Sequence, residues 1–594
     1  MQTAQTYLEV VRRRGERRLE LRRVYHNLKN RELFLLAYGK LYANKGALTP
    51  GTDLQDTADA MSLKRIDDLI AALEQGTYQW KPVRRLHIPK KNGKTRPLGI
   101  TSWSDKLLQE VIRMVLSAYY EPQFANSSHG FRPGRGCHTA LWSIAHGWKG
   151  IKWYVEGDIQ GCFDNINHSQ LLAIISRSVK DDRLLKLLKG MLEAGYLEEW
   201  TYGMTYSGVP QGGVLSPLLS NIYMNELDTY VEQILIPRYT KGKRRRCNRE
   251  YARLGAAKRK AKREGDLERY RTLKQQQQAI PSGWMDDPDY RRLQYCRYAD
   301  DFLLGFAGPK HEAEEIKSEI GKFLQALGLT LSQEKTLVTH ATTASARFLG
   351  YHAKAVINNS RRGNNGHRTL NGRTVLQVPQ AVEQEWRSRY SQRGESRHRT
   401  NLSQRSDHDI VTAYAVELQG LVNYYQLAGN VAGRLYPVKY TMQQSLVKTL
   451  AHKHKRPVTW VYRKYKRKMK NGVTAIVVET PREGKRPLVA KFGAQPIRHD
   501  DRVIVNDQRA FIWPNRNELV KRLLANQCEL CGSTADVQVH HLRKLKDIQQ
   551  WYKGRPNPPT WVVRQMELHR KTLVVCGKCH REIHAGIYDG PKLK

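Results

Sequence analysis

Long apolar runs are missing from this sequence. No window approaches the ~20 consecutive apolar residues that a membrane-spanning helix needs, so we expect no transmembrane segment. The first residues, MQTAQTYLEVVRRRGERRLELRRV, contain no apolar stretch followed by a cleavage site, which argues against an export signal. These two absences predict a protein that stays inside the cell and has no membrane partner.

Acidic residues are scarce relative to basic ones. The 594 residues include 100 Lys and Arg against 56 Asp and Glu, which gives a formal net charge of +44. Such an excess opposes compaction by self-repulsion unless a polyanion neutralises it. Nucleic acid is the expected partner, because basic side chains that displace condensed counterions gain affinity. A histone-like packing protein would share this charge, but the motifs described below look catalytic.

Cysteines are few, and only four of the eight show a regular spacing. Cys528, Cys531, Cys576 and Cys579 form two CxxC pairs with 44 residues between them. Paired spacing in a chain without an export signal favours a metal over disulfides. Four thiolates close a tetrahedral site around Zn²⁺ at ~2.3 Å per bond. We therefore predict a structural Zn²⁺ in a segment that has too few apolar residues for a core.

An acidic pair interrupts an apolar stretch in YCRYADDFLLGF, residues 295–306. Burying unpaired carboxylates costs several kcal/mol, so Asp300 and Asp301 require a cation. The pattern predicts a hairpin with both aspartates at its turn, and KWYVEGDI predicts a strand that ends at Asp158. One sheet could bring these carboxylates together, and three of them suit two Mg²⁺ ions about 3.5–4 Å apart. Such a site performs phosphoryl transfer mainly by positioning and charge neutralisation.

Histidines near the C-terminus suggest a second metal site. His580 and His584 are four residues apart and can share one face of a helix. With His540 they could hold one divalent ion. His541 is then available as a general base that deprotonates the water attacking a phosphodiester.

Two further stretches are notable for charge or polarity. Residues 238–274 carry 16 Lys and Arg against four acidic residues, and we favour a phosphate-contacting insertion over a merely solvated face. Residues 357–408 are rich in Arg, Asn, Ser and Gly, which predicts a connection between two domains. Two amphipathic helices, DIVTAYAVELQGLVNYYQLA and YTMQQSLVKTLAHKHK, are expected after it.

Several blocks occur in the order expected of reverse transcriptases. They are IPKKNGKTRPLGI, SSHGFRPGRGCHTAL, VEGDIQGCFDNINH, GVPQGGVLSPLLSNIYMNELD, YCRYADDFLLGF, LGLTLSQEKT and RFLGY. From about residue 60 to its end, the chain resembles the group II intron-encoded proteins. These combine a reverse transcriptase with a maturase and often an endonuclease.

The resemblance implies roles for individual polymerase residues. Asp158, Asp300 and Asp301 would bind two Mg²⁺ ions, with the Ile159 carbonyl as a further ligand. Phe163 matches the aromatic steric gate that excludes a ribonucleotide 2′-hydroxyl, although a core phenylalanine is the alternative. The other matched positions would contact the nucleotide: Lys94 and Arg96 at the triphosphate, Gln211 near the sugar and Lys335 near the phosphates.

The C-terminal segment resembles the HNH endonuclease, or ββα-metal, motif, with VHH and CHREIH as its two parts. This implies that His540, His580 and His584 bind one Mg²⁺ or Mn²⁺ ion, and that His541 activates water. Lys571 stands where many HNH sequences have an Asn that orients the loop carrying the base. A cation there could instead hold DNA phosphate.

We therefore expect a multidomain α+β protein, a right-hand polymerase of fingers, palm and α-helical thumb followed by a small zinc-containing HNH domain. The expected divisions are an N-terminal extension (1–60), fingers and palm (61–356) with a basic insertion (237–290), a polar linker (357–404), a thumb or maturase domain X (405–470), a DNA-binding segment (471–515) and the endonuclease (516–594).

The expected function is that of a mobile-intron protein in a bacterium, cytoplasmic or nucleoid-associated. It would bind its intron RNA, assist splicing, nick target DNA and use dNTPs to reverse-transcribe from the nick. The alternative is a splicing-only maturase with an inactive polymerase or nuclease. A nuclease-centred defence protein is a further rival, which the resemblance to domain X disfavours.

Overall fold

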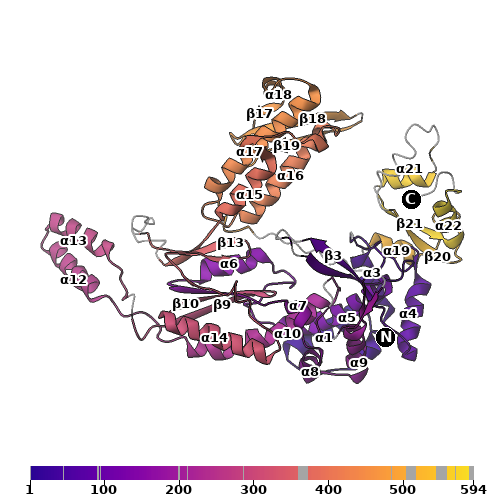
Figure 1. Cartoon of the computed structure of the whole chain (residues 1–594), viewed down its shortest axis with the longest axis horizontal. Coiled ribbons are helices and arrows are strands. Elements are labelled where there is room, and N and C mark those ends of the chain that lie inside the picture. The colour runs from indigo at the N-terminus through magenta and orange to yellow at the C-terminus, as the bar shows by residue number, and fades with distance from the viewer. Residues whose placement is uncertain are drawn as a thin grey trace.

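The computed structural model describes residues 2–44, 46–89, 93, 95–198, 201–205, 207–209, 212–284, 287–358, 372–482, 484–503, 517–542, 558, 560–568 and 570–587. Figure 1 shows a long base of helices and sheets, from which a helical bundle rises near the middle and a small C-terminal module rises at one end. Within the described ranges, none of the helices is long and apolar enough to cross a bilayer.

A four-stranded antiparallel sheet forms the centre of the base. Its order is β11-β5-β10-β9. Alternate side chains of a strand point to opposite faces, and accordingly Phe302 and Leu304 join the core beneath the sheet while Leu303 joins the core above it. Burial on both faces explains the continuous apolar run FLLGF. The elements are β5 (Trp153–Asp158), β9 (Arg292–Tyr298), β10 (Asp301–Ala307) and β11 (Val338–His340), with α10 (Ser216–Tyr230) and α14 (Lys310–Ala326) below and α6 (Cys137–Gly147) above.

The N-terminal residues are part of the same core. Helix α1 packs along α5, and Val11 and Phe34 are fully buried beside the residues of α5. A second sheet, of order β4-β3-β7-β8, projects from this region. The elements are α1 (Ala4–Glu16), α3 (Arg31–Leu41), α4 (Leu63–Gln75), β3 (Val83–Pro89), β4 (Thr95–Ile100), α5 (Trp103–Tyr120), α8 (His168–Ser178), α9 (Asp182–Glu193), β7 (Tyr196–Glu198) and β8 (Thr201–Gly203).

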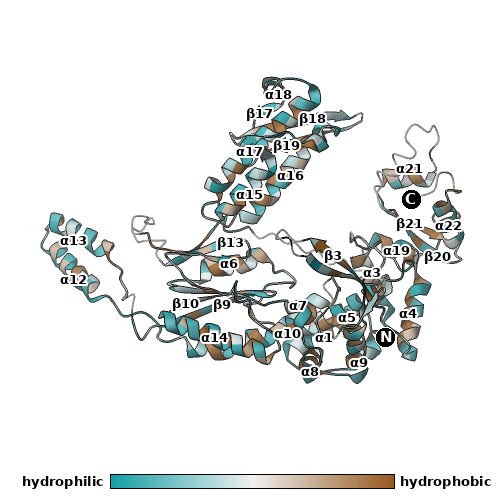
Figure 2. Ribbon diagram, in the orientation of Figure 1, coloured by the Kyte–Doolittle hydropathy of each residue, from teal (hydrophilic) through white to brown (hydrophobic). Residues whose placement is uncertain are grey.

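The basic insertion forms a helical hairpin of α12 (Arg249–Arg263) and α13 (Leu267–Ala279). Figure 1 shows it projecting from the end of the base opposite the C-terminal module. Most of its residues are coloured as hydrophilic in Figure 2, and few of its side chains are buried. The hairpin therefore presents its positive charge to the solvent.

The bundle above the base begins earlier than the sequence suggests. Much of the range expected to be a polar linker, 357–404, is ordered secondary structure, because β14 pairs with β13 and α15 packs against α17. Sheet β17-β18-β19 packs against α16, so residues as far as Phe492 share the bundle's core. The elements are β12 (Ala346–Phe348), β13 (Tyr351–Val356), β14 (Arg373–Gln377), α15 (Gln380–Tyr390), α16 (Asp407–Tyr425), α17 (Val431–His454), α18 (Val458–Tyr465), β17 (Lys466–Lys468), β18 (Thr474–Arg482) and β19 (Lys485–Phe492).

The C-terminal module is a ββα unit that docks on the N-terminal helices. Strand β2 (Met61–Ser62) pairs with β20 (Val537–His541), which pairs in turn with β21 (Thr572–Cys576). Val539 and Val520 lie in one apolar core with Phe34 and Met61. The remaining elements are α19 (Glu518–Leu524), α21 (Thr560–Glu567) and α22 (Gly577–Ala585).

Candidate active sites

Three predicted metal ligands meet at one edge of the central sheet. The register of β5 and β10 pairs Asp158 directly with Asp301. Asp300 lies in the turn between β9 and β10, where Ala299 adopts a left-handed conformation with φ of 56°. The structure thus brings together residues 142 positions apart in the chain.

The raised pKa values of these carboxyl groups show that the site favours a bound cation. Burial, the neighbouring Asp300 carboxylate and a hydrogen bond with Asp158 raise the pKa of Asp301 to about 7. Burial and the Asp158 charge also raise the pKa of Asp300, against the opposing effect of Arg96. Several carboxylates in one buried site cannot all be ionised without a cation. The donor set therefore fits the two Mg²⁺ ions that the sequence predicts.

The other predicted polymerase residues surround this edge where the structure describes them. The Lys335 ammonium lies 2.8 Å from Asp158 Oδ2, although the lysine side chain is largely exposed. Ile159 is buried, and the neighbouring Asp158 carbonyl accepts a hydrogen bond from the Ser332 amide. Arg96 is exposed on β4. Lys94 and Gln211 lie outside the described residues.

A group of aromatic rings lies beside the turn that carries Asp300. Phe163, on the short helix α7 (Cys162–Asn165), is half-buried and meets the edge of Phe131 at a centroid distance of 6.2 Å. The Phe131 ring lies 6.5 Å from that of Tyr298, which directly precedes the turn that carries Asp300. Phe131 was not singled out from the sequence. Its signal is an aromatic residue directly after Gly130 in HGFRPG, and here it has a φ of 58° and is 50% exposed.

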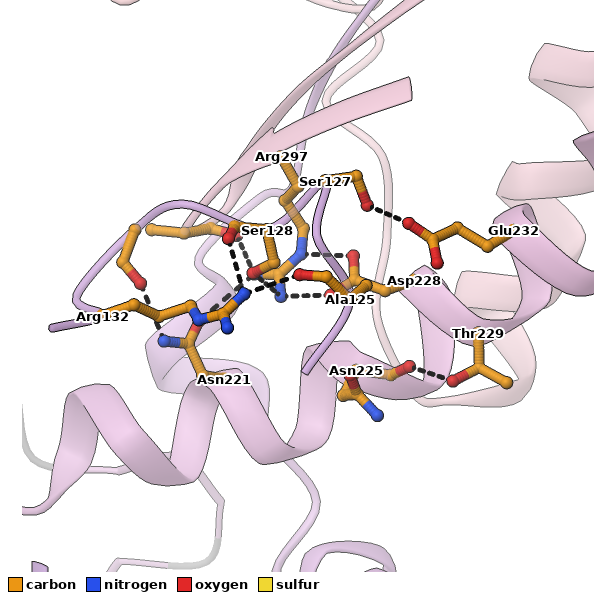
Figure 3. A network of polar contacts seen from close by, with 12 residues as sticks. Ala125, Ser127, Ser128, Arg132, Asn221, Asn225, Asp228, Thr229, Glu232 and Arg297 are labelled. Carbon is orange, nitrogen blue, oxygen red and sulfur yellow. Dashed lines mark hydrogen bonds and ion pairs between the residues drawn. The ribbon is translucent and has the colours of Figure 1, made fainter. Parts of the chain in front are cut away.

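A buried ion pair anchors the turn that carries Asp300 (Figure 3). Arg297 and Asp228 are both fully buried, and the guanidinium donates to both carboxylate oxygens at 2.7 and 2.6 Å. The same guanidinium donates to the Ala299 carbonyl at 2.8 Å and to Ser128 Oγ at 2.8 Å. Sequence reasoning missed this pair, although both residues stand within the quoted motifs. A charged residue inside a buried strand was the available signal.

The loop containing Gly130 holds the turn from its other side. A Cβ atom at Gly130 would lie 2.4 Å from the Ala299 amide nitrogen, so only glycine fits. The Gly130 carbonyl accepts a hydrogen bond from the side-chain amide nitrogen of Asn221 at 2.8 Å. The turn that carries Asp300 is therefore hydrogen-bonded to Arg297 on one side and packed against Gly130 on the other.

The four paired cysteines converge at the C-terminal module. Their sulfur atoms all lie within 4.8 Å of one another, and those of Cys531 and Cys576 are 3.6 Å apart. A tetrahedral site with ~2.3 Å Zn–S bonds requires sulfurs about 3.8 Å apart. The amides of Cys531 and Cys579 also donate to the sulfurs of Cys528 and Cys576, which favours thiolates. The cluster fits a zinc ion.

The predicted nuclease histidines also converge. The Nε2 atoms of His580 and His584 are 3.1 Å apart, and both ring nitrogens of His540 are buried without a hydrogen-bond partner among the described residues. Gln538 Oε1 accepts a hydrogen bond from His580 Nδ1 at 2.9 Å, which leaves Nε2 of His580 for a metal. Asp59, from the N-terminal region, joins these histidines, and its Oδ2 lies 2.9 Å from His584 Nε2. Sequence reasoning missed Asp59.

The predicted general base is held from two sides. His541 is 9% exposed, and its Nε2 lies 3.2 Å from the Tyr38 hydroxyl. The Lys571 carbonyl accepts a hydrogen bond from the Leu542 amide at 2.9 Å. The backbone at position 571 thus holds Leu542, the residue that directly follows the predicted base.

Comparison with known proteins accounts for both sites in one chain. Residues 88–247 and 268–353 match the reverse transcriptase (RNA-dependent DNA polymerase) family, 380–488 the type II intron maturases and 528–580 the AI2M/AI1M-like HNH endonucleases. The group II intron-encoded protein LtrA of Lactococcus lactis subsp. cremoris is 37% identical over 589 residues, which covers 94% of this chain and 95% of LtrA. The chain is a group II intron-encoded protein.

Two further relatives are also similar over most of this intron-encoded protein. The putative COX1/OXI3 intron 1 protein of Saccharomyces cerevisiae is 30% identical and the 91 kDa protein in cob intron of Schizosaccharomyces pombe is 32% identical. Each alignment covers 94% of this chain, with 68% and 69% of the respective relatives. The matched maturase range begins at the start of α15, in agreement with the bundle's extent in the structure.

Replacing one of the four cysteines tests whether the cluster in the intron-encoded protein binds zinc. Cys576→Ser is expected to release one zinc per chain and unfold the C-terminal module, because the cluster ties β21 and α22 to the Cys528 loop. Zinc content by atomic absorption and limited proteolysis measure both effects. Cys247→Ser, at an exposed cysteine on the basic insertion, is the matched control and should retain the metal. Full zinc content in Cys576→Ser would contradict the assignment.

Proposed function

We propose that the HNH module cuts one strand of a target DNA and that the polymerase extends the new 3′-hydroxyl to copy the intron RNA. The observation that carries this proposal is the presence, in one chain, of a three-carboxylate edge and a three-histidine cluster, both suited to metal-assisted phosphodiester chemistry. Hydrolysis that expels O3′ leaves the group a polymerase needs. The two activities would thus act in sequence on one DNA strand.

At the polymerase site, Asp158, Asp300 and Asp301 would hold two Mg²⁺ ions, with the Ile159 carbonyl contributing. Bound there, the ions lower the pKa of the primer hydroxyl and neutralise the triphosphate. Arg96 and Lys335 supply cations beside the carboxylates, where Lys94 is also expected to grip the dNTP. Phe163 presents a rigid ring at this edge, which supports its role as the gate against a 2′-hydroxyl.

At the nuclease site, His540, His580 and His584 would hold one Mg²⁺ or Mn²⁺ ion, and His541 would take a proton from the attacking water. The burial of His541 lowers its pKa to about 4, so the imidazole is neutral at pH 7. The cysteine cluster would carry a structural Zn²⁺.

The layout supports a right-hand polymerase with fingers at β3–β4, a palm at the central sheet and a thumb at α15–α17. Intron RNA would contact the thumb and the basic hairpin α12–α13, where lysines and arginines face the solvent. The segment after the thumb would contact target DNA. The formal net charge of +44 supports a location in the bacterial cytoplasm, where the protein would associate with the nucleoid.

Separating the nick from the copying step tests this proposal. RNA that co-purifies with the protein is sequenced first, so that a target DNA can be chosen by complementarity to it. His541→Ala should reduce nicking of that duplex at least about 100-fold, because a general base contributes a factor of 10²–10⁴. The same variant should extend a primer already annealed to the RNA at the wild-type rate.

His311→Ala, at an exposed histidine on α14, is the control and should retain both activities. Unchanged nicking by His541→Ala would refute the assigned base. Loss of extension on the annealed primer would refute the independence of the two sites.

A further inference from the structure

The nuclease histidines have a fourth partner that comes from the opposite end of the chain. Asp59 lies just before β2, and its Oδ2 atom is 2.9 Å from His584 Nε2 and 3.4 Å from His580 Nε2. Its Oδ1 atom is 3.9 Å from His540 Nδ1. All four donor atoms lie within 4.8 Å of one another. A carboxylate aimed at three imidazoles is arranged as a metal ligand.

Asp59 also contacts the strand that carries the predicted general base. Its Oδ1 accepts a hydrogen bond from the His541 amide at 2.7 Å. The attacking water and the scissile phosphate must both occupy the space between the ion and the base. A carboxylate in this space excludes the phosphate by volume and by charge. With Asp59 bound as a fourth protein ligand, an octahedral Mg²⁺ or Mn²⁺ ion keeps two coordination positions instead of three for water and phosphate.

The base itself is covered by the same region of the chain. Tyr38 is fully buried on α3, and its hydroxyl lies 3.2 Å from His541 Nε2. The rings of Tyr38 and Tyr42 lie 6.5 and 6.4 Å from the His541 ring. With only 9% of His541 exposed, a DNA duplex cannot reach it.

The docking that produces this arrangement is extensive. Strand β2 extends the sheet of the C-terminal module, and the Ala60 amide donates to the Val539 carbonyl at 3.0 Å. On α3, the Gly39 carbonyl accepts a hydrogen bond from Asn517. Leu519, Val520 and Leu523 of α19 pack into the N-terminal apolar core. The contact is therefore a built interface between residues 38–62, here called the N-terminal cap, and the nuclease.

We propose that the N-terminal cap inhibits the nuclease: Asp59 is the fourth ligand of the nuclease ion in the docked state, and the module must leave the cap before it cuts DNA. This inference rests on the nuclease site assigned above. It predicts that the ion binds most tightly in the inactive, docked arrangement. Any DNA or RNA that separates the cap from β20 then frees the position beside His541.

Manganese binding tests the ligand role without relying on activity. The full-length, zinc-loaded protein is titrated with Mn²⁺, and free Mn²⁺ is followed by electron paramagnetic resonance. Asp59→Asn keeps the side-chain volume but removes the charge, and it should weaken Mn²⁺ binding at the nuclease site at least tenfold. Asp68→Asn, at an exposed aspartate on α4, is the matched control and should bind as the wild type does. Unchanged affinity in Asp59→Asn would overturn the ligand assignment.

Nicking of supercoiled plasmid at saturating Mn²⁺, without RNA, tests the inhibitory role. Asp59→Asn and Asp59→Ala should convert plasmid to open circles at least fivefold faster than the wild type. Equal or slower conversion, including none, would show that Asp59 does not restrain the nuclease. Unchanged primer extension and zinc content confirm that the variants are folded.

His540→Ala separates this inference from the proposed nuclease site. This variant should lose Mn²⁺ binding at the nuclease site altogether. If it binds Mn²⁺ like the wild type, the assigned histidine site fails. If it loses binding while Asp59→Asn does not, only the role of the cap fails.

Discussion

Asp300→Ala is expected to lower the rate of cDNA synthesis by at least about 10³-fold. The change removes one of the three carboxylates that converge where β5 and β10 meet, and a metal site stabilises its transition state by several kcal/mol. A loss of about 4 kcal/mol corresponds to about 10³ in rate. Extension of oligo(dT) on poly(rA) in Mg²⁺ measures the effect, with RNA binding as the parallel readout.

RNA binding by Asp300→Ala should equal that of the wild type, because the substitution removes a carboxylate and little packing, and the basic hairpin α12–α13 projects from the end of the base (Figure 1). Glu334→Gln, at an exposed carboxylate beside Lys335, is the matched control and should extend the primer normally. Loss of RNA binding in Asp300→Ala would mean that the substitution damages the fold rather than the site.

Asp300→Ala should have a higher free energy of unfolding than the wild type at pH 8 without Mg²⁺. A raised carboxyl pKa in the folded state means that folding favours the protonated form, so stability is lost as pH rises through the folded pKa. For Asp301 that value is about 7, and the Asp300 charge is its second-largest cause after burial. Removing Asp300 relieves this repulsion. In the wild type, the repulsion between these carboxylates thus lowers the stability of the fold when no cation is bound.

The central sheet and its carboxylates were accessible to sequence reasoning because their signals are local. The apolar stretch interrupted by Asp300 and Asp301 and the strand before Asp158 each predict where a carboxylate stands, and a hairpin motif predicts the turn. The cysteine pairs and the i, i+4 histidines are local signals too. In each case a short segment holds the spacing that the chemistry needs.

The partners that were missed lie far away in the sequence. Asp228 is 69 residues from Arg297, and Asp59 is 525 residues from His584, so no spacing rule connects them. Helix α15 was taken for a linker because its sequence, QAVEQEWRSRY, is polar and only Tyr390 is buried. Its position is determined by packing on α17, which composition does not reveal.

The Arg297–Asp228 pair is expected to show the largest effect of any change outside the metal ligands. Arg297→Met leaves the fully buried Asp228 without its cation, and breaking a buried pair in this way costs about 3–5 kcal/mol. It also removes the guanidinium hydrogen bond to the Ala299 carbonyl, which fixes the turn carrying Asp300. We therefore expect both a lower free energy of unfolding in urea and a loss of primer extension.

A double variant separates stability from positioning. Arg297→Met combined with Asp228→Leu replaces both charges by apolar groups, which is often neutral for stability at buried pairs. Its unfolding midpoint should recover toward the wild-type value, whereas kcat stays low because the Ala299 carbonyl still lacks its donor. Arg177→Met, which breaks an exposed pair with Glu226, is the control and should cost under about 1 kcal/mol. Wild-type kcat in the double variant would mean that Gly130 and its loop hold the turn without Arg297.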